Sequence, residues 1–183
     1  STDTLKMQRG KTTLRVISFI EKMKDASHDM IHVACYDGSG ALRDITDINN
    51  LNKQLGSTRA SITPHDFLRF LRQKNVFLVV ARDASHDPSG ASPGTIVGKA
   101  SLHIVELDDS TKKALVEQVV VDGAYRGAGI ADKIDDMLCA IAKENNVAYI
   151  DLTSNPSRVA ANKFYIRRGY VKRETNVYRK KIV

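Results

Sequence analysis

The stretch Arg126-Gly127-Ala128-Gly129-Ile130-Ala131 (RGAGIA) joins an apolar run to a helical pattern. The run, residues 115–121, has the length of a strand, and residues 130–143 carry apolar side chains at helical spacing. Glycines let a backbone approach an anion closely, and the free N–H groups of a first helical turn point toward it. This strand, turn and helix therefore predict a phosphate-binding loop, although turns of this kind also occur where nothing binds.

Two familiar phosphate-binding loops do not match these residues. A Walker loop needs a Lys and then a Ser or Thr after its last glycine, and Ile130 and Ala131 stand there. A dinucleotide-binding loop needs a third glycine, and Asp132 occupies its position. The loop therefore belongs to neither group.

The sequence around the loop resembles the GNAT acetyltransferases, which bind acetyl-coenzyme A. The loop matches their R-x-x-G-x-A signature, and residues 117–125 (EQVVVDGAY) resemble the strand that precedes it in that superfamily. Residues 161–170 (ANKFYIRRGY) resemble a segment near the superfamily's C-terminus. The resemblance is specific over 96–183. It departs at Arg158, where many members carry Asn.

The resemblance and the order of the periodic segments both predict an α/β fold, with a mixed, mostly antiparallel central sheet flanked by helices. We expect an N-terminal extension over 1–29, partly helical or disordered, and a single acetyltransferase domain over 30–183. Residues 11–24 fit a helix and, nearly as well, a strand. Expected strands are 30–36, 75–81, 95–107, 114–121, 147–153, 170–173 and 178–182. Expected helices are 44–55, 63–73, 130–143 and 156–167, and a long surface loop is expected over 83–94.

The resemblance implies a set of coenzyme-binding residues. The backbone groups of Val119 and Val121 would bind the pantetheine arm, while their side chains could equally be ordinary core. Asn162 is a further candidate contact, and a position on the helix surface fits it equally well. The residues expected to wrap the pyrophosphate are Arg126, Gly127, Ala128, Gly129, Ile130 and Ala131.

Two residues are candidates for catalysis. The resemblance places Tyr165 near the coenzyme sulfur, where a phenol, with a solution pKa of about 10, can protonate the departing thiolate. Packing alone is the alternative role for Tyr165. Glu117 stands nine residues before Arg126, where small-amine acetyltransferases carry acidic residues, so it is the candidate base. Binding the acceptor or a structural role explains Glu117 equally well.

The remaining polar residues give weaker signals. The five histidines show no metal-ligand spacing, so no metal is expected, and His103 is a second candidate base because it lies on a strand near the expected cleft. Cys35 and Cys139 are too far apart in the sequence for a metal site. They are expected to be buried free thiols, which favours a reducing, cytoplasmic location.

Composition limits the partners. The net charge of +7 comes from intermixed residues of both signs, which argues against nucleic acid as a partner, and no apolar run is long enough to span a membrane.

Taken together, the sequence predicts an N-acetyltransferase that moves the acetyl group of acetyl-CoA to a primary amine by direct attack. The acceptor, a small molecule or a protein amino group, stays open, as does a homodimer. The alternative is a non-catalytic acyl-CoA sensor or scaffold.

Overall fold

The structure, a computed structural model, describes residues 31–56, 61–85 and 94–182. The expected N-terminal extension, the segment 11–24 and most of the loop 83–94 lie outside these residues. The chain divides into two compact units, Ser1–Leu152 and Thr153–Val183. Each unit is described by itself.

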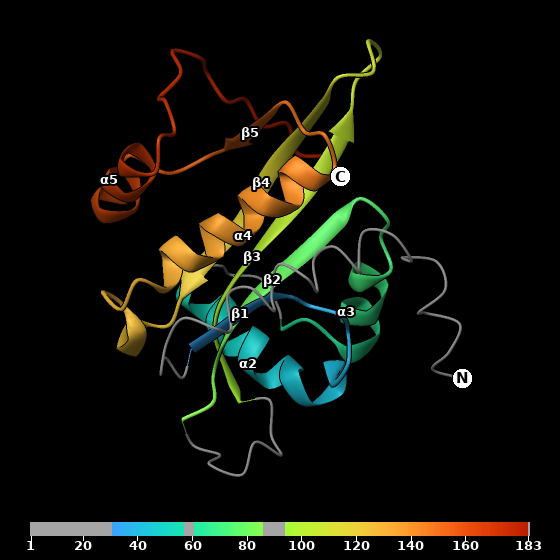
Figure 1. The fold of residues 1–183 in the computed structure, drawn as a ribbon, viewed down its shortest axis with the longest axis vertical. Coiled ribbons are helices and arrows are strands. Elements are labelled where there is room, and N and C mark those ends of the chain that lie inside the picture. The colour runs from blue at the N-terminus through green and yellow to red at the C-terminus, as the bar shows by residue number, and fades with distance from the viewer. Residues whose placement is uncertain (1–30, 57–60, 86–93, 183) are drawn as a thin grey trace. The chain divides into compact units, whose positions relative to one another are not determined.

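The first unit is built on a five-stranded sheet in the order β1-β2-β3-β4-β5 (Figure 1). The first three pairings are antiparallel, and β4 with β5 is parallel. The predicted mixed, mostly antiparallel sheet is therefore confirmed. The strands are β1 (Ile31–Cys35), β2 (Val76–Asp83), β3 (Thr95–Glu106), β4 (Lys112–Val121) and β5 (Tyr149–Leu152).

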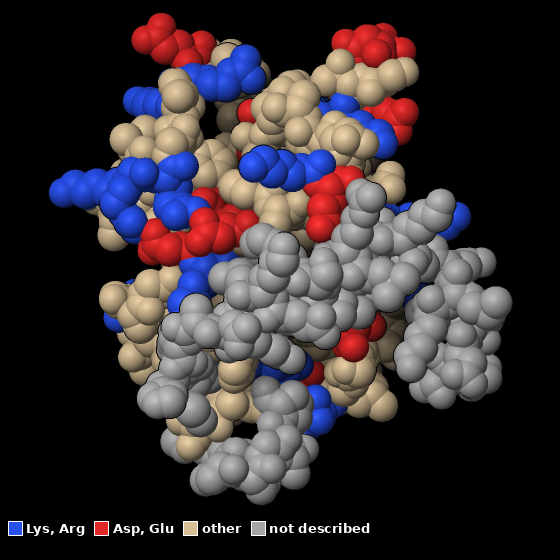
Figure 2. Space-filling view, viewed as in Figure 1, with Lys and Arg blue, Asp and Glu red and all other residues tan. Residues whose placement is uncertain are grey.

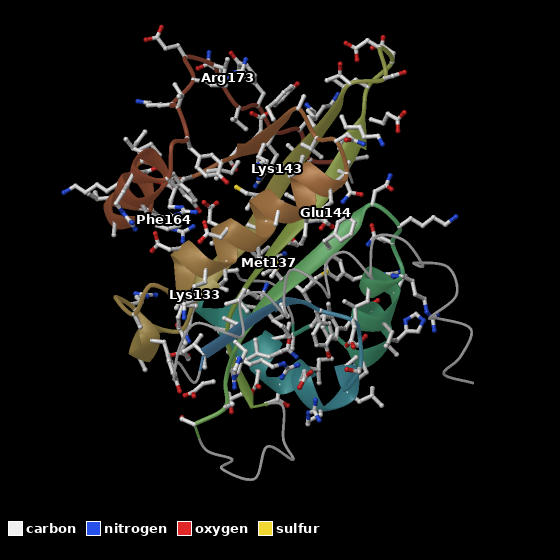
Figure 3. All side chains as sticks on the ribbon, viewed as in Figure 1. Lys133, Met137, Lys143, Glu144, Phe164 and Arg173 are labelled. Carbon is white, nitrogen blue, oxygen red and sulfur yellow. The ribbon has the colours of Figure 1, made fainter. Side chains whose placement is uncertain are left out.

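Helices cover both faces of this sheet. The helix α4 (Ile130–Glu144) covers one face, and α2 (Ala41–Gln54) and α3 (Pro64–Leu71) cover the other. Because side chains alternate along a strand, β2, β3 and β4 supply apolar residues to both cores. Figure 3 shows Met137 on α4, between Lys133 near its start and Lys143 near its end. The core under α4 includes Val79, Ala100, Leu102, Val116, Ile134, Met137 and Ile141.

The helix starts follow local signals. Thr63 caps α3, because its hydroxyl accepts the Asp66 N–H at 3.1 Å and Pro64 opens the first turn. Helix α2 begins three residues before the predicted start, after Gly40 in the left-handed region. Asp44, where the helix was expected to begin, is buried in the first turn of α2.

A bulge lies beside Gly98 on β3, since the β2–β3 register shifts between Ala81 and Arg82. The absence of a side chain at Gly98 lets α4 approach closely. A Cβ there would stand 3.1 Å from the Ile134 Cδ1 and 3.3 Å from the Ile130 Cγ2. Gly98 thereby sets the height at which the start of α4 packs on the sheet.

Three expectations are wrong. The strands predicted at 170–173 and 178–182 are absent, and the exposed fractions of Val171 (84%) and Tyr178 (87%) show that little packs on them. A two-stranded pair without packing is marginal. Helix α5 (Val159–Arg167) starts three residues late, because the Asn155 side chain accepts the Ser157 N–H in a preceding turn. Cys139 is exposed on α4.

The surface of the described residues carries both signs of charge. On the face shown in Figure 2, Lys and Arg side chains are interspersed with Asp and Glu, as the composition predicts. None of the helices in the described ranges is both long and apolar enough to cross a membrane.

Candidate active site

The glycine loop is held at its base by a clamp from α2. Asp122 follows β4, and its carboxylate accepts hydrogen bonds from the Ala124 N–H at 2.9 Å and from the Gln54 Nε2 at 2.7 Å. The Gln54 Oε1 in turn accepts the Gly123 N–H at 3.0 Å. The hydrogen bond from the Ala124 N–H, and to a smaller extent that from Gln54, hold the pKa of Asp122 below its usual range. The last residue of α2 therefore fixes where the loop leaves the sheet.

The loop itself is open toward solvent. Gly127 and Gly129 have φ of 84° and 73°, the left-handed region that other residues avoid. No described atom beyond their neighbours lies within 4 Å of where their Cβ atoms would stand. Gly129 precedes α4, whose first turn closes when the Lys133 N–H donates to the Gly129 carbonyl. The amides of Ile130 and Ala131 come before that bond and point out of the helix end.

The strand β4 changes its pairing halfway along. The β3–β4 register shifts between Lys99 and Ser101, which leaves one extra residue on β4. Gln118 supplies this bulge, with a φ of 54° that is unusual for a residue other than glycine. On the other side, β5 pairs with β4 only along Lys113–Val116. Among the described residues no strand continues that pairing beside the rest of β4.

This change leaves backbone groups of β4 available. The Asp122 N–H donates to the Val97 carbonyl on β3 at 2.8 Å. Successive amides of a strand point to opposite edges, so those of Val119 and Val121 point away from β3. They face the side on which β5 has ended. This edge and the glycine loop are consecutive in the chain and could hold an extended ligand with a phosphate end.

A polar cluster lies on the α2/α3 face of the sheet, beside the bulge. Ser101 and Glu117 are opposite each other, and His103 is two residues along β3. The Ser101 Oγ lies 3.0 Å from the His103 Nε2 and donates to the Glu117 carbonyl at 3.3 Å. Burial lowers the pKa of His103, and the Glu117 charge partly opposes that shift. Glu117 is itself exposed.

The bulge is also anchored from β3. Lys99, only 3% exposed, donates from its Nζ to the Gln118 Oε1 at 3.0 Å. Ser101, Gln118 and Gln54 are the site residues that the sequence did not reveal. Ser and Gln are ordinary surface residue types, so nothing in the sequence marks these three positions as part of a site.

The second unit carries the other two predicted residues. Tyr165 on α5 is 9% exposed and packs edge-to-face on Phe164 and Tyr170, with ring centroids 5.3 and 5.6 Å apart. The Asn162 Nδ2 donates to the carbonyls of Asn155 and Arg158 at 2.9 and 3.0 Å. These bonds hold the turn before α5, so Asn162 has a structural role there. Figure 3 labels Phe164 and Arg173 in this unit.

The described ranges contain no group of three or more His, Cys, Asp or Glu that could hold a metal ion. Glu117, Val119, Val121 and the loop from Arg126 to Ala131 lie on one strand and the turn that follows it. These predicted residues are close together in the chain, and the second candidate base, His103, lies on the neighbouring strand β3.

The family of this chain follows from its similarity to known proteins. The model of the acetyltransferase (GNAT) family matches residues 43–170, and the chain belongs to that family. L-2,4-diaminobutyric acid acetyltransferase of Streptomyces coelicolor is 28% identical over 102 residues, which are 55% of this chain and 54% of that protein. The chain thus spans about half the length of this curated relative.

Solved structures share the fold. Glucosamine-6-phosphate N-acetyltransferase from Arabidopsis thaliana is 19% identical with a TM-score of 0.67, covering 83% of this chain and 99% of that one. An aminoglycoside N-acetyltransferase in complex with CoA is 15% identical with a TM-score of 0.67, covering 82% and 94%. The predicted GNAT fold is therefore confirmed.

Proposed function

We propose that the chain is an N-acetyltransferase that moves the acetyl group of acetyl-CoA to a primary amine. The observation that carries this proposal is the continuity of the free β4 edge with the open glycine loop. Val119 and Val121 offer backbone groups to the amide-containing pantetheine arm. The amides from Gly127 to Ala131 and the start of α4 offer N–H groups and partial positive charge to the pyrophosphate. A solved neighbour bound to CoA supports the same use.

The reaction is a direct transfer. Acetyl-CoA supplies an activated acyl group as a thioester. The acceptor nitrogen forms a bond to the carbonyl carbon, the carbon–sulfur bond breaks, and the thiolate takes a proton while the nitrogen loses one. In this proposal Tyr165 is the acid for the thiolate, and Glu117 receives the acceptor amine. Arg126, exposed at the loop, adds positive charge near the phosphates.

The acceptor nitrogen must be neutral before it attacks. An alkyl ammonium has a pKa near 10, so removing its proton at pH 7 costs about 4 kcal/mol. A carboxylate at Glu117 can accept that proton or hold the ammonium, and its charge also favours the protonated amine. Glu117 therefore serves as base or as acceptor-binding group.

The proposed acceptor class is a small molecule with a primary amine. The relatives named for such acceptors, 2,4-diaminobutyrate, glucosamine 6-phosphate and aminoglycosides, differ widely in charge and shape. A panel of these three compounds, with a peptide amino terminus as the fourth member, covers the classes that the sequence left open. Asn162 stays a proposed coenzyme contact in the second unit.

Calorimetric titration with acetyl-CoA tests the coenzyme half. We expect one-to-one binding with a micromolar Kd, about −8 kcal/mol. Thiol release from acetyl-CoA with each member of the panel then tests the transfer. An absence of binding up to millimolar coenzyme would support a scaffold, and binding without turnover on any amine would support an acyl-CoA sensor.

A further inference from the structure

Building on the proposed N-acetyltransferase function, we propose that His103 is a catalytic residue whose Nδ1 takes the proton from the acceptor ammonium, while the Glu117 carboxylate binds that ammonium. His103, Ser101 and Glu117 lie on one face of two paired strands, directly beside the Gln118 bulge. His103 then removes the proton and Glu117 holds the ammonium, two roles that Glu117 alone could not fill together.

The hydrogen bonds around Ser101 fix the tautomer of His103. The Ser101 hydroxyl has one proton, and the Glu117 carbonyl at 3.3 Å can only accept it. The Ser101 Oγ must then accept from its other neighbour, the His103 Nε2 at 3.0 Å. Nε2 therefore carries the proton of the neutral ring, which leaves the lone pair on Nδ1. No partner for Nδ1 is found among the described residues.

The surroundings keep His103 neutral yet able to accept a proton. The centroid of the Phe70 ring on α3 lies 6.1 Å from the centroid of the His103 imidazole, and His103 is half-buried. Burial disfavours imidazolium, so the base is already deprotonated at pH 7. Glu117, a diagonal neighbour across the strands, stabilises the imidazolium once it forms.

The other charged groups near this face leave the stabilisation of the His103 imidazolium to Glu117. Lys99 on β3 is bonded to Gln118, and Asp66 and Arg69 on α3 are bonded to each other at the surface. On β2 the positions that pair with His103 and Ser101 are Val76 and Leu78, which are apolar. The residues of β4 on this face, by strand alternation, are Lys113, Leu115 and Glu117.

Imidazole suits the proton transfer better than a carboxylate does. A general base works best when its pKa is near the working pH, and a carboxyl group at about 4.3 lies much further from the amine than imidazole at about 6.5. The ammonium loses one proton, and Nδ1 gains it, giving imidazolium. After the amide product leaves, the imidazolium returns that proton to solvent.

His103→Gln is the decisive variant, because its side-chain amide keeps an N–H donor near Nε2 but has no basic nitrogen. With the best acceptor of the panel, we expect kcat to fall about 100-fold or more, with the Kd for acetyl-CoA unchanged. The wild-type rate should fall as pH drops through the His103 pKa, below 6.5, and the variant should lack that step. The wild-type advantage then shrinks at low pH.

Two further variants separate chemistry from packing. His103→Ala should regain activity when imidazole is added at millimolar concentration, which a purely structural role would not allow. Ser101→Ala keeps His103 as the base but removes the hydrogen bond that fixes its tautomer. Its kcat should fall about tenfold or less, and the pH step should remain. An unchanged kcat and pH step in His103→Gln would overturn the role of His103. Wild-type protein that releases no thiol with any amine would instead overturn the proposed function itself.

Discussion

At the residue scale, Gly129 tests whether the loop binds an anion. Gly129→Glu and Gly129→Gln place side chains of equal size at a left-handed φ of 73°, so both lose about 1–2 kcal/mol of backbone stability. Only the Glu variant brings a negative charge beside the proposed pyrophosphate site. We expect calorimetry to show acetyl-CoA binding weakened at least tenfold more by Glu than by Gln.

The two variants also share any steric effect on the coenzyme, since no described atom crowds the Gly129 position. Thermal unfolding should therefore give the same Tm for both. Equal coenzyme affinities in the two variants would contradict a phosphate at this helix start.

Glu117 offers a second test at this scale, through the titration of His103. The Glu117 charge raises the pKa of His103 against the larger effect of burial, so Glu117→Gln should move that pKa further below 6.5. NMR titration of the His103 ring protons measures the shift without any substrate. Glu106→Gln, further along β3 at an exposed position, is the control and should leave the titration unchanged.

Some of these residues were within reach of sequence reasoning and others were not. Glycines 127 and 129 were predicted, because only glycine adopts positive φ readily, and both do so. Gln118 adopts it without being a glycine, so the bulge that ends regular pairing had no signal in the sequence. Ser101 gains its meaning only from the register that sets it opposite Glu117.

At the element scale, the strands with strong apolar content and the helices with clear caps were predicted to within a few residues. The failures were the strands of 170–173 and 178–182, where β-branched and aromatic residues gave local strand propensity without a surface to bury. Propensity in strands reflects packing on neighbours, and these side chains remain exposed in the second unit.

Gly98 gives the prediction that belongs to this scale. In Gly98→Val, the added side chain meets Ile134 and Ile130 and lifts the start of α4, at a cost of about 1–3 kcal/mol. The loop that precedes α4 moves with it, so acetyl-CoA binding should weaken about tenfold. Urea unfolding and calorimetry measure the two effects.

Ala142→Val is the matched control, because it overpacks the opposite, C-terminal end of the same helix. It should lose similar stability and keep its coenzyme affinity. If both variants lost affinity alike, general destabilisation rather than the position of the loop would be the cause.

At the scale of the whole molecule, a buried ion pair ties α2 to the sheet. Asp44 is 2% exposed and accepts from the Arg82 Nη2 at 2.5 Å and the Tyr36 hydroxyl at 2.7 Å. Burial opposes ionisation most strongly, yet the bonds from Arg82, Tyr36 and Arg43 together lower the pKa of Asp44. The partners are far apart in the sequence, so the pair could not be predicted from it.

The stability of the first unit should therefore depend on Arg82 and on pH. Arg82→Met leaves a buried carboxylate with its main partner removed, and we expect a loss of about 3–5 kcal/mol at pH 7. Arg43→Met removes the other arginine, whose side chain is 56% exposed, and should lose about 1 kcal/mol or less. Urea unfolding of both variants beside wild type measures the difference.

The pH dependence distinguishes loss of charge pairing from loss of packing. In wild type the Asp44 pKa is lowered, so its contribution is present above about 3.8 and is lost as pH falls through the lower folded value. Without Arg82 the folded pKa rises, and Asp44 takes up a proton at a higher pH. The deficit of Arg82→Met should hence shrink from pH 7 to pH 4.5. A deficit that is constant across this range would mean that Arg82 stabilises the fold through its apolar stem alone.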